Sequence, residues 1–384
     1  KGLRRVCEEG LLPFMATGFT TGRALRPTGK VLPEHARGHN RSLVLQTLYR
    51  GALLSRADIA RETGLTRVTV SDLMAELLED GLVVETGQRE DARPGKPATM
   101  LAFNAGSACV IGIDLSSHTT FRGAVLKLDG SIIARADVPL DGARGAAALA
   151  KVHELTTQLL ELATVTALGI GVGSPGVVDL AGTVLSAPNL DWEEVELRAE
   201  LAERHNVPVL VSNDANVAAL AEHSFGGGTS DMLLVTIGHG VGGGLVLGGM
   251  AVFGSRFASG EIGHVVVGTD GGAICACGKE ACLETWLAVP RLEAALASAT
   301  TQAQRTGVLS AAGRRLGIAL APVVGVLDLS EIVLVGPPHL VDGPLAEATI
   351  ATLRERTMAK FHSHIGLRMS ALDDIVLRGA AVMV

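Results

Sequence analysis

Aromatic residues are scarce in this sequence, at 3% of 384 residues, while hydrophobic residues reach 47%. A chain built mainly from Ala, Val, Leu and Gly is expected to be a soluble α/β protein rather than a disordered one. No apolar run has the length of a membrane span, so we expect no membrane partner. An apolar stretch at residues 11–16 follows Glu8 and Glu9, which argues against a secretory signal and predicts a cytoplasmic protein.

The sequence also lacks an excess of positive charge, since its net charge is −7. This argues against a surface coated for non-specific nucleic-acid binding, but it permits a small DNA-reading module on a larger acidic body. The length predicts two or three domains. Residues 1–38 show no helical or strand periodicity and are expected to be a poorly determined extension. The remaining sequence divides into a first domain at 39–103, a hinge at 104–108 and a second domain at 109–384.

Capping and turn residues predict three short helices in the first domain. Asn40 is expected to cap the first helix and Ser55 the second, with Asp58 in a capping-box position. Thr66 opens the third helix after a Gly-Leu turn. Two short helices joined in this way form a helix-turn-helix. The helix ends are expected at Gly51, Gly64 and Gly81.

The third helix and the segment after it favour a DNA-binding domain over an ordinary three-helix bundle. Recognition helices meet base edges near their N-terminal end, and this helix carries polar side chains there. Two strand-like runs follow at residues 82–86 and 98–103. Between them, a Pro-Gly-x-Pro frame predicts the tip of a wing that suits a minor groove or phosphates. The residues expected to contact DNA are Arg67, Thr69, Ser71 and Asp72 on the helix, and Arg93 and Lys96 on the wing.

Three of the five cysteines, Cys275, Cys277 and Cys282, lie close together in the sequence and follow His264. A Cys₃His set is typical of closed, tetrahedral zinc sites. The alternatives are buried thiols or a disulfide, but a Cys-x-Cys disulfide closes a strained ring and thiols stay reduced inside cells. We therefore predict a structural Zn²⁺ held by these four residues.

Two carboxylates flank the metal set, with Glu261 before His264 and Glu284 after Cys282. If one imidazole nitrogen of His264 holds zinc, the other nitrogen carries a proton and becomes a fixed donor. A donor between two acceptors suits a polyol better than a flat aromatic ligand. The expected small-molecule ligand is therefore a polyol.

The segment Glu-Ile-Gly-His from Glu261, followed by Cys-x-Cys-Gly-x-x-x-Cys-x-Glu, resembles the hallmark of the ROK family of repressors and sugar kinases. One departure is Ala281, where the family usually has glycine. From the residues alone, Asn213 and Asp214 read as a helix N-cap after a strand at 209–212. The resemblance implies instead that they hold sugar hydroxyls, and that Asp214 matches the general base of the kinases. The implied sugar-binding set is Asn213, Asp214, Glu261, His264 and Glu284.

The order of predicted elements in the second domain indicates two lobes. Strands at 109–115, 120–128 and 131–138 precede a helix at 143–162 and a strand at 167–172. A similar order begins again at residue 232. Together with the resemblance, this order implies an actin-like, ribonuclease-H-like ATPase fold with two lobes around a cleft.

The motifs that bind ATP in kinases of this fold are degraded here. Asp114 is followed by Leu-Ser-Ser-His, without the glycines that let backbone N–H groups approach phosphate. His239 stands in the second phosphate loop where the family has threonine, and Pro337 and Pro338 occupy the adenosine-side turn where the family keeps glycines. These departures predict that the chain is not an enzyme and that Asp214 is the vestige of a kinase base.

The sequence thus predicts a sugar-responsive transcription regulator, expected to repress genes of carbohydrate metabolism. It has an N-terminal winged helix-turn-helix and a two-lobed, zinc-stabilised sugar-binding domain. Family precedent implies a homodimer or homotetramer that binds a palindromic operator and responds to a sugar or sugar phosphate. One alternative is an active ATP-dependent sugar kinase, similar to glucokinase, that carries a DNA-binding arm. Another is a regulator that senses a protein partner.

Overall fold

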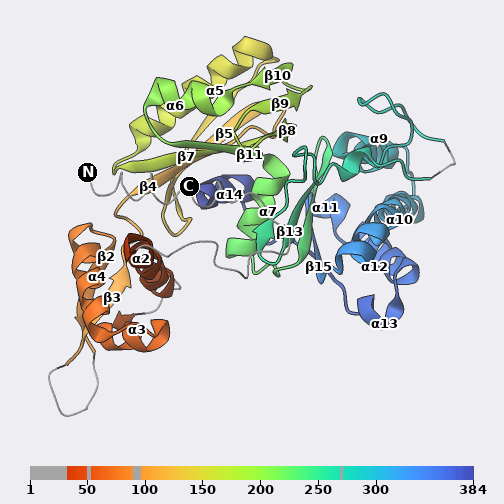
Figure 1. The fold of residues 1–384 in the computed structure, drawn as a ribbon. Coiled ribbons are helices and arrows are strands. Elements are labelled where there is room, and N and C mark those ends of the chain that lie inside the picture. Colours follow the sequence, from red (N-terminus) through yellow and green to blue (C-terminus); the bar gives the residue numbers. More distant parts are fainter. Residues whose placement is uncertain (1–32, 50–52, 90–96, 269–270) are drawn as a thin grey trace. The chain divides into compact units, whose positions relative to one another are not determined.

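The computed structural model describes residues 33–49, 53–89, 97–268 and 271–384 (Figure 1). The chain divides into two compact units. The main part of the first ends at Val110, and this unit also includes Leu126–Ile133 and Ala163–Leu168. The second unit comprises Ile111–Val125, Ala134–Leu162 and Gly169–Val384. Three predicted features, the helix end at Gly51 and the wing-tip residues Arg93 and Lys96, lie outside the described residues.

In its described residues, the first unit contains three helices and a small sheet, which together we call the head. The sheet has the strand order β1-β3-β2. The predicted N-cap at Asn40 was wrong, because the first helix begins at Pro33 and Asn40 lies within it. Proline fits the first helical turn, where no N–H is needed for a helical hydrogen bond. The elements of the head are α2 (Pro33–Tyr49), β1 (Leu54–Ser55), α3 (Arg56–Thr63), α4 (Arg67–Glu79), β2 (Val83–Gln88) and β3 (Thr99–Phe103).

The predicted caps of the helix-turn-helix are confirmed. Ser55 and Asp58 form a capping box at the start of α3, and Gly64 ends that helix with a φ of 72°. The side chain of Thr66 accepts from the amide of Thr69 at the start of α4. The buried face of α4 follows a helical period, so four apolar side chains enter the core of the head. These are Val70, Leu73, Met74 and Leu77.

Two five-stranded sheets form the framework of the second domain. Their strand orders, β11-β7-β4-β5-β6 and β14-β13-β12-β15-β16, place the first strand of each set in the middle, with the next two strands on one side. This repeated order confirms the prediction of two lobes. The first sheet consists of β4 (Cys109–Asp114), β5 (Thr120–Lys127), β6 (Ile132–Pro139), β7 (Ala167–Ser174) and β11 (Val209–Asn213). The second consists of β12 (Met232–Ile237), β13 (Val241–Leu247), β14 (Met250–Ala251), β15 (Glu331–Val335) and β16 (Gly366–Met369).

Helices and a minor sheet complete the domain. The minor sheet, β10-β9-β8, was not predicted, and it consists of short strands. Its strands are β8 (Val177–Val178), β9 (Val184–Ala187) and β10 (Trp192–Val195). The longer helices are α5 (Gly145–Leu162), α6 (Leu197–His205), α7 (Asp214–Phe225), α9 (Val289–Ala297), α10 (Gln302–Leu327), α12 (Pro344–Arg356) and α14 (Ile375–Met383). The short ones are η1 (Ile262–His264), α8 (Glu284–Leu287), α11 (Pro338–Val341) and α13 (Ala359–His362).

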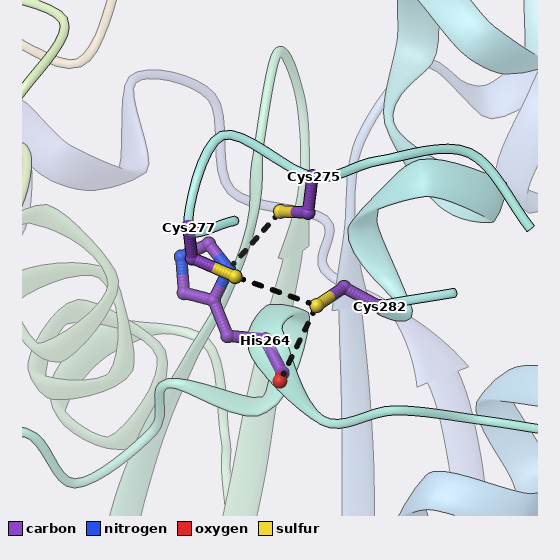
Figure 2. Close-up of side chains that lie close together, drawn as sticks. All are labelled: His264, Cys275, Cys277 and Cys282. Carbon is purple, nitrogen blue, oxygen red and sulfur yellow. Dashed lines mark hydrogen bonds between the residues drawn. The ribbon is translucent and has the colours of Figure 1, made fainter. Parts of the chain in front are cut away.

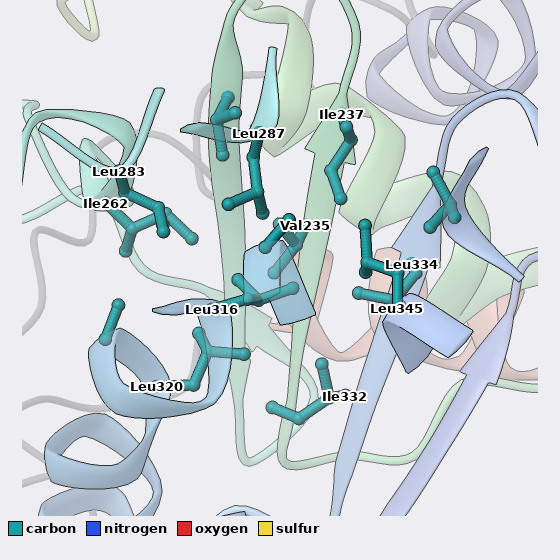
Figure 3. Close-up of a cluster of buried hydrophobic side chains, with 14 of the residues drawn as sticks. Val235, Ile237, Ile262, Leu283, Leu287, Leu316, Leu320, Ile332, Leu334 and Leu345 are labelled. Carbon is teal, nitrogen blue, oxygen red and sulfur yellow. The ribbon is translucent and has the colours of Figure 1, made fainter. Parts of the chain in front are cut away.

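A large apolar core fills the second lobe between its sheet and its helices (Figure 3). Val235 and Leu334 from the sheet meet Leu316 and Leu320 from α10, and all four are fully buried. By length and composition α10 could cross a membrane, but half of its most apolar stretch is buried within the protein, as in many core helices. The core fixes the sheet that carries the loops of the candidate site.

Two glycines let α14 approach both β7 and α7 closely. A Cβ atom at Gly171 in β7 would lie 1.9 Å from the carbonyl oxygen of Ala380, and one at Gly379 would lie 1.9 Å from that of Val217. No other residue fits at such distances. The C-terminal helix is thereby packed against α7, the helix whose first turn carries Asp214.

Candidate functional site

The four predicted metal ligands converge in space (Figure 2). Their ligand atoms all lie within 4.8 Å of one another. The Sγ atom of Cys275 lies 3.4 Å from Nδ1 of His264, and the Sγ atoms of Cys277 and Cys282 are 3.5 Å apart. A disulfide needs about 2.05 Å between sulfurs, so these cysteines are free thiols. Three sulfurs and one imidazole nitrogen at such spacing fit a tetrahedral zinc ion.

Backbone pairing brings together the two ends of the segment that runs from His264 to Cys282. Single bridges pair Val266 with Cys282 and Ile274 with Glu280. Ala281, the departure from the family pattern, has a φ of 59°, in the left-handed region that favours glycine. The fold therefore retains at this position the backbone conformation for which glycine is suited.

The three thiols differ in acidity before any metal binds. The backbone amide of Lys279 is the main cause that lowers the pKa of Cys277 to about 7. Burial raises the pKa of Cys282 to about 12 and also raises that of Cys275. A metal ion takes thiolates as ligands, so its binding must release protons, chiefly from the two buried cysteines.

His264 turns its two ring nitrogens in different directions. Nδ1 faces the sulfur atoms, whereas Nε2 lies 3.9 Å from Oε2 of Glu261. That distance is too long for a direct hydrogen bond, and both side chains are more than a third exposed. Nε2 is therefore open to a ligand, with the Glu261 carboxylate beside it.

Glu284 is tied to the same loops. One carboxylate oxygen accepts from the amide of Val241 at 3.2 Å, and the other lies 3.7 Å from Sγ of Cys275. Burial and the neighbouring charge of Glu284 raise the pKa of Glu261, while His264 lowers it. The two predicted carboxylates thus lie within electrostatic range of each other and flank the metal set.

Asn213 and Asp214 begin α7. Oδ1 of Asn213 accepts from the amides of Ala215 and Asn216, and its Nδ2 donates to the carbonyl of Gly176 at 2.9 Å. The predicted N-cap is therefore confirmed, and most of this side chain is engaged within the protein. Burial first, and then the charges of Asp114 and Glu261, raise the pKa of Asp214 to about 7.

The loop expected to meet phosphate in a kinase is occupied by other contacts. Asp114 is 2% exposed, its Oδ1 accepts from the amide of Ser116, and Arg122 donates to its Oδ2 at 2.7 Å. The rings of His118 and His239 meet edge to face with centroids 4.3 Å apart. Sequence reasoning missed both the Arg122 pairing and the histidine contact, because each depends on which loops the fold brings together.

The turn predicted to lie on the adenosine side of a kinase site is also engaged in local structure. Pro338 is the first residue of α11, and the carbonyl of Pro337 accepts from the amides of Leu340 and Val341. A Cβ atom at Gly336 would lie 2.6 Å from the carbonyl oxygen of Ile237. The turn therefore packs directly on the end of β12 and offers no N–H group from either proline.

The head presents part of its predicted DNA-contacting set to solvent. Arg67, Ser71 and Asp72 are exposed on α4. Thr69 is half-buried, and its hydroxyl lies 2.9 Å from that of Thr66. Thr69 therefore contributes to the start of the helix.

Two family models match the chain, one for each functional part. The MarR family model matches residues 39–94 and the ROK family model matches residues 110–384. The chain belongs to the ROK family. Its N-terminal domain is a MarR-like winged helix-turn-helix, which confirms the predicted fold class.

Several relatives of this ROK protein are regulators and others are kinases. It is 32% identical over 275 residues to the xylose repressor of Caldicellulosiruptor bescii, which covers 70% of this chain and 67% of that repressor. The structure of a ROK family transcriptional regulator, a homologue of E. coli MLC protein, covers 91% of this chain and 96% of that chain, with a TM-score of 0.77 at 23% identity. That likeness concerns the fold.

A kinase relative covers a smaller part of the chain. The ROK hexokinase of Thermus thermophilus is 30% identical, with a TM-score of 0.59, and covers 72% of this ROK protein but 97% of the hexokinase. Nearly the whole kinase is therefore accounted for by about three quarters of this chain. The remaining part of this chain has no counterpart in the hexokinase.

Proposed function

We propose that this ROK protein is a sugar-responsive transcriptional repressor of carbohydrate-metabolism genes. The single observation that carries this proposal is the presence of a MarR-type head and a ROK domain in one chain. The likeness to the C. bescii xylose repressor supports the repressor class. Its site of action would be the cytoplasm, where operator DNA is accessible.

The proposed sugar site consists of Asp214, Glu261, His264 and Glu284, with Asn213 in a supporting role. Oxygen acceptors and the Nε2 donor of His264 suit hydroxyl groups, and their mutual effects on pKa support a shared site. Because Asn213 is engaged as a cap and by Gly176, its contribution would be to hold the first turn of α7.

The proposed metal is a structural Zn²⁺ held by His264, Cys275, Cys277 and Cys282. Bound zinc would supply cross-linking of this segment rather than a reactive water, because the four protein ligands complete a tetrahedral shell. If Nδ1 of His264 held the metal, the proton of the imidazole would reside on Nε2, where it could be donated to a sugar hydroxyl. Zinc binding would thus position the Nε2–H group of His264 as a hydrogen-bond donor to the sugar.

We further propose that the protein does not phosphorylate its sugar. The Asp114 carboxylate is neutralised by Arg122, and His118 and His239 contact each other where a kinase needs open phosphate loops. The alternative function is an active sugar kinase, and the likeness to the T. thermophilus hexokinase supports this alternative. Release of ADP that depends on both a sugar and Asp214 would favour that alternative.

The operator is proposed to be palindromic and bound by a homodimer or homotetramer. Two recognition helices related by a twofold axis would read half-sites about one helical turn, or a multiple of it, apart. The DNA contacts would come from Arg67 and Ser71 on α4, with Thr69 at its start, and from Arg93 and Lys96 of the wing. The effector would be a sugar or sugar phosphate.

The decisive experiment is an operator titration with and without a sugar. A thermal-shift screen of monosaccharides and their phosphates selects the ligand, because a ligand at a hundred times its Kd stabilises a protein by about 2.7 kcal/mol. Coupling between two sites is commonly 1–3 kcal/mol, or about 5- to 150-fold in affinity. Glu261→Gln should bind the operator as wild type does but lose most of the sugar response.

Glu293→Gln is the matched control, since Glu293 is an exposed carboxylate on α9. It should respond to sugar like wild type. If Glu261→Gln also responds like wild type, the proposed sugar site is wrong. If the full chain binds no specific DNA sequence under any condition, the proposed function itself is wrong.

A further inference from the structure

Val68 is the second residue of α4, and 72% of its surface is exposed. A valine so open to water at the N-terminal end of a helix gains no stability from burial. The other valine of this turn, Val70, is fully buried in the core of the head. Val68 is therefore an apolar group that the surface of α4 presents to solvent.

The helical phase of α4 places Val68 opposite the core. With 3.6 residues per turn, the buried residues of α4 lie about 140° to 240° away from Val68 around the helix axis. Ser71, Asp72 and Ala75 lie within about 60° of Val68 by the same measure, and all three are exposed. Val68 is thus at the centre of the outward face of the second helix in the helix-turn-helix.

The position of Val68 is held by the helix cap. Oγ1 of Thr66 accepts from the amide of Thr69 at 3.2 Å, and the hydroxyls of Thr66 and Thr69 are 2.9 Å apart. These contacts start the helix one residue before Val68. The β-branched side chain of Val68 also has few rotamers in a helix, so its two methyl groups have a defined direction.

The chemistry of this face suits base edges better than phosphates. Asp72 carries a negative charge that phosphates repel, and Val68 offers them no hydrogen bond. Arg67 lies at the edge of the face and makes no hydrogen bond or ion pair with any described residue. Its guanidinium group is therefore available to a DNA phosphate or to a guanine base. In the major groove, the apolar group that distinguishes one base from the others is the 5-methyl group of thymine.

We propose that Val68 contacts the 5-methyl group of a thymine in each operator half-site and so determines specificity at that position. This inference rests on the proposed DNA-binding function and names the base that the head reads. Burying one methyl group corresponds to about 0.8 kcal/mol, or roughly fourfold in affinity. The effect should be confined to one position of the half-site.

The test uses the full chain and a binding site selected from randomised duplex DNA. Each thymine of the half-site is replaced in turn by deoxyuridine, which lacks only the 5-methyl group. Wild type should lose about fourfold in affinity at one thymine. Val68→Ala should bind thymine and uracil equally at that position. Val68→Thr keeps one γ-methyl group and should retain part of the discrimination, whereas Val68→Ser should not.

Val326→Ala is the matched control, because Val326 is also an exposed valine, at 82%, but lies on α10 outside the head. It should discriminate like wild type. The inference is wrong if wild type binds a specific DNA sequence but no thymine-to-uracil replacement weakens binding, or if Val68→Ala is weakened by that replacement as much as wild type is. Either result leaves the proposed function standing. If the chain selects no DNA sequence at all, both this inference and the proposed function are wrong. The two kinds of failure can therefore be told apart.

Discussion

Asp58→Asn is expected to destabilise the head by about 2 kcal/mol at neutral pH. The Asp58 side chain is only 7% exposed and accepts from the hydroxyl of Ser55 at 2.6 Å. Arg61 and Arg89 each donate to the carboxylate at 2.9 Å. Arg89 follows β2 at the base of the wing, so Asp58 links the first turn of α3 to the wing.

The magnitude follows from the acidity of this carboxyl group. The hydrogen bond from Ser55 is the largest cause that lowers the pKa of Asp58, against an opposing effect of burial, and the two arginines add to it. The pKa falls from 3.8 to about 2. At about 1.36 kcal/mol per pH unit, the ionised form stabilises the fold by roughly 2.4 kcal/mol. Asparagine keeps one oxygen acceptor, so the expected loss is slightly smaller.

The same values set the pH dependence. A carboxyl whose pKa is lower in the folded state contributes its full stability above the unfolded value of 3.8 and loses it as the pH falls through 2. Wild type and Asp58→Asn should therefore differ by about 2 kcal/mol at pH 7 and converge as the pH approaches 2.

Hydrogen exchange of the buried α4 amides in the full chain measures this free energy locally. Operator affinity of Asp58→Asn should fall as well, because Asp58 orients both α3 and the wing base. Glu62→Gln, an exposed carboxylate on the same helix, is the control and should match wild type. A loss below about 0.5 kcal/mol at pH 7, or one that is equally large at pH 2, would refute the reasoning.

Three further predictions concern the second domain. Freshly purified protein should contain close to one zinc per chain by elemental analysis, and Cys277→Ser should lose this zinc. Cys109→Ser, which changes a buried thiol outside the cluster, should keep it. A zinc-free wild type would contradict the metal assignment. A coupled assay of ADP release over common hexoses, pentoses and amino sugars should stay at background, and sugar-dependent turnover above it would reverse the conclusion. Sugar affinity measured by calorimetry should rise between pH 6 and pH 8, because burial raises the pKa of Asp214 to about 7 and its carboxylate accepts hydrogen bonds best when ionised. If Asp214→Asn shows the same pH profile as wild type, another group is responsible.

Local sequence patterns predicted the features that depend on neighbouring residues. The capping box of Ser55 and Asp58 spans one helical turn, and the predicted metal ligands from His264 to Cys282 occupy one short segment. Five strands of the second domain also began within two residues of their predicted positions, because alternation and buried apolar runs are local signals. The start of α2 was misjudged, since Asn40 has the chemistry of a cap but the helix had already begun.

Only the tertiary structure decided which distant groups meet. Arg122 reaches Asp114 because β5 lies beside β4 in the sheet, and His118 meets His239 because two loops more than a hundred residues apart are brought together by the fold. The outward exposure of Val68 likewise depended on which face of α4 the core of the head covers. By itself the sequence determined the family, the cluster of His264 with three cysteines and the caps of α3, α4 and α7, because each is encoded by residues close in the chain. Long-range pairing is set by sheet order and core packing, and no short stretch of residues carries that information.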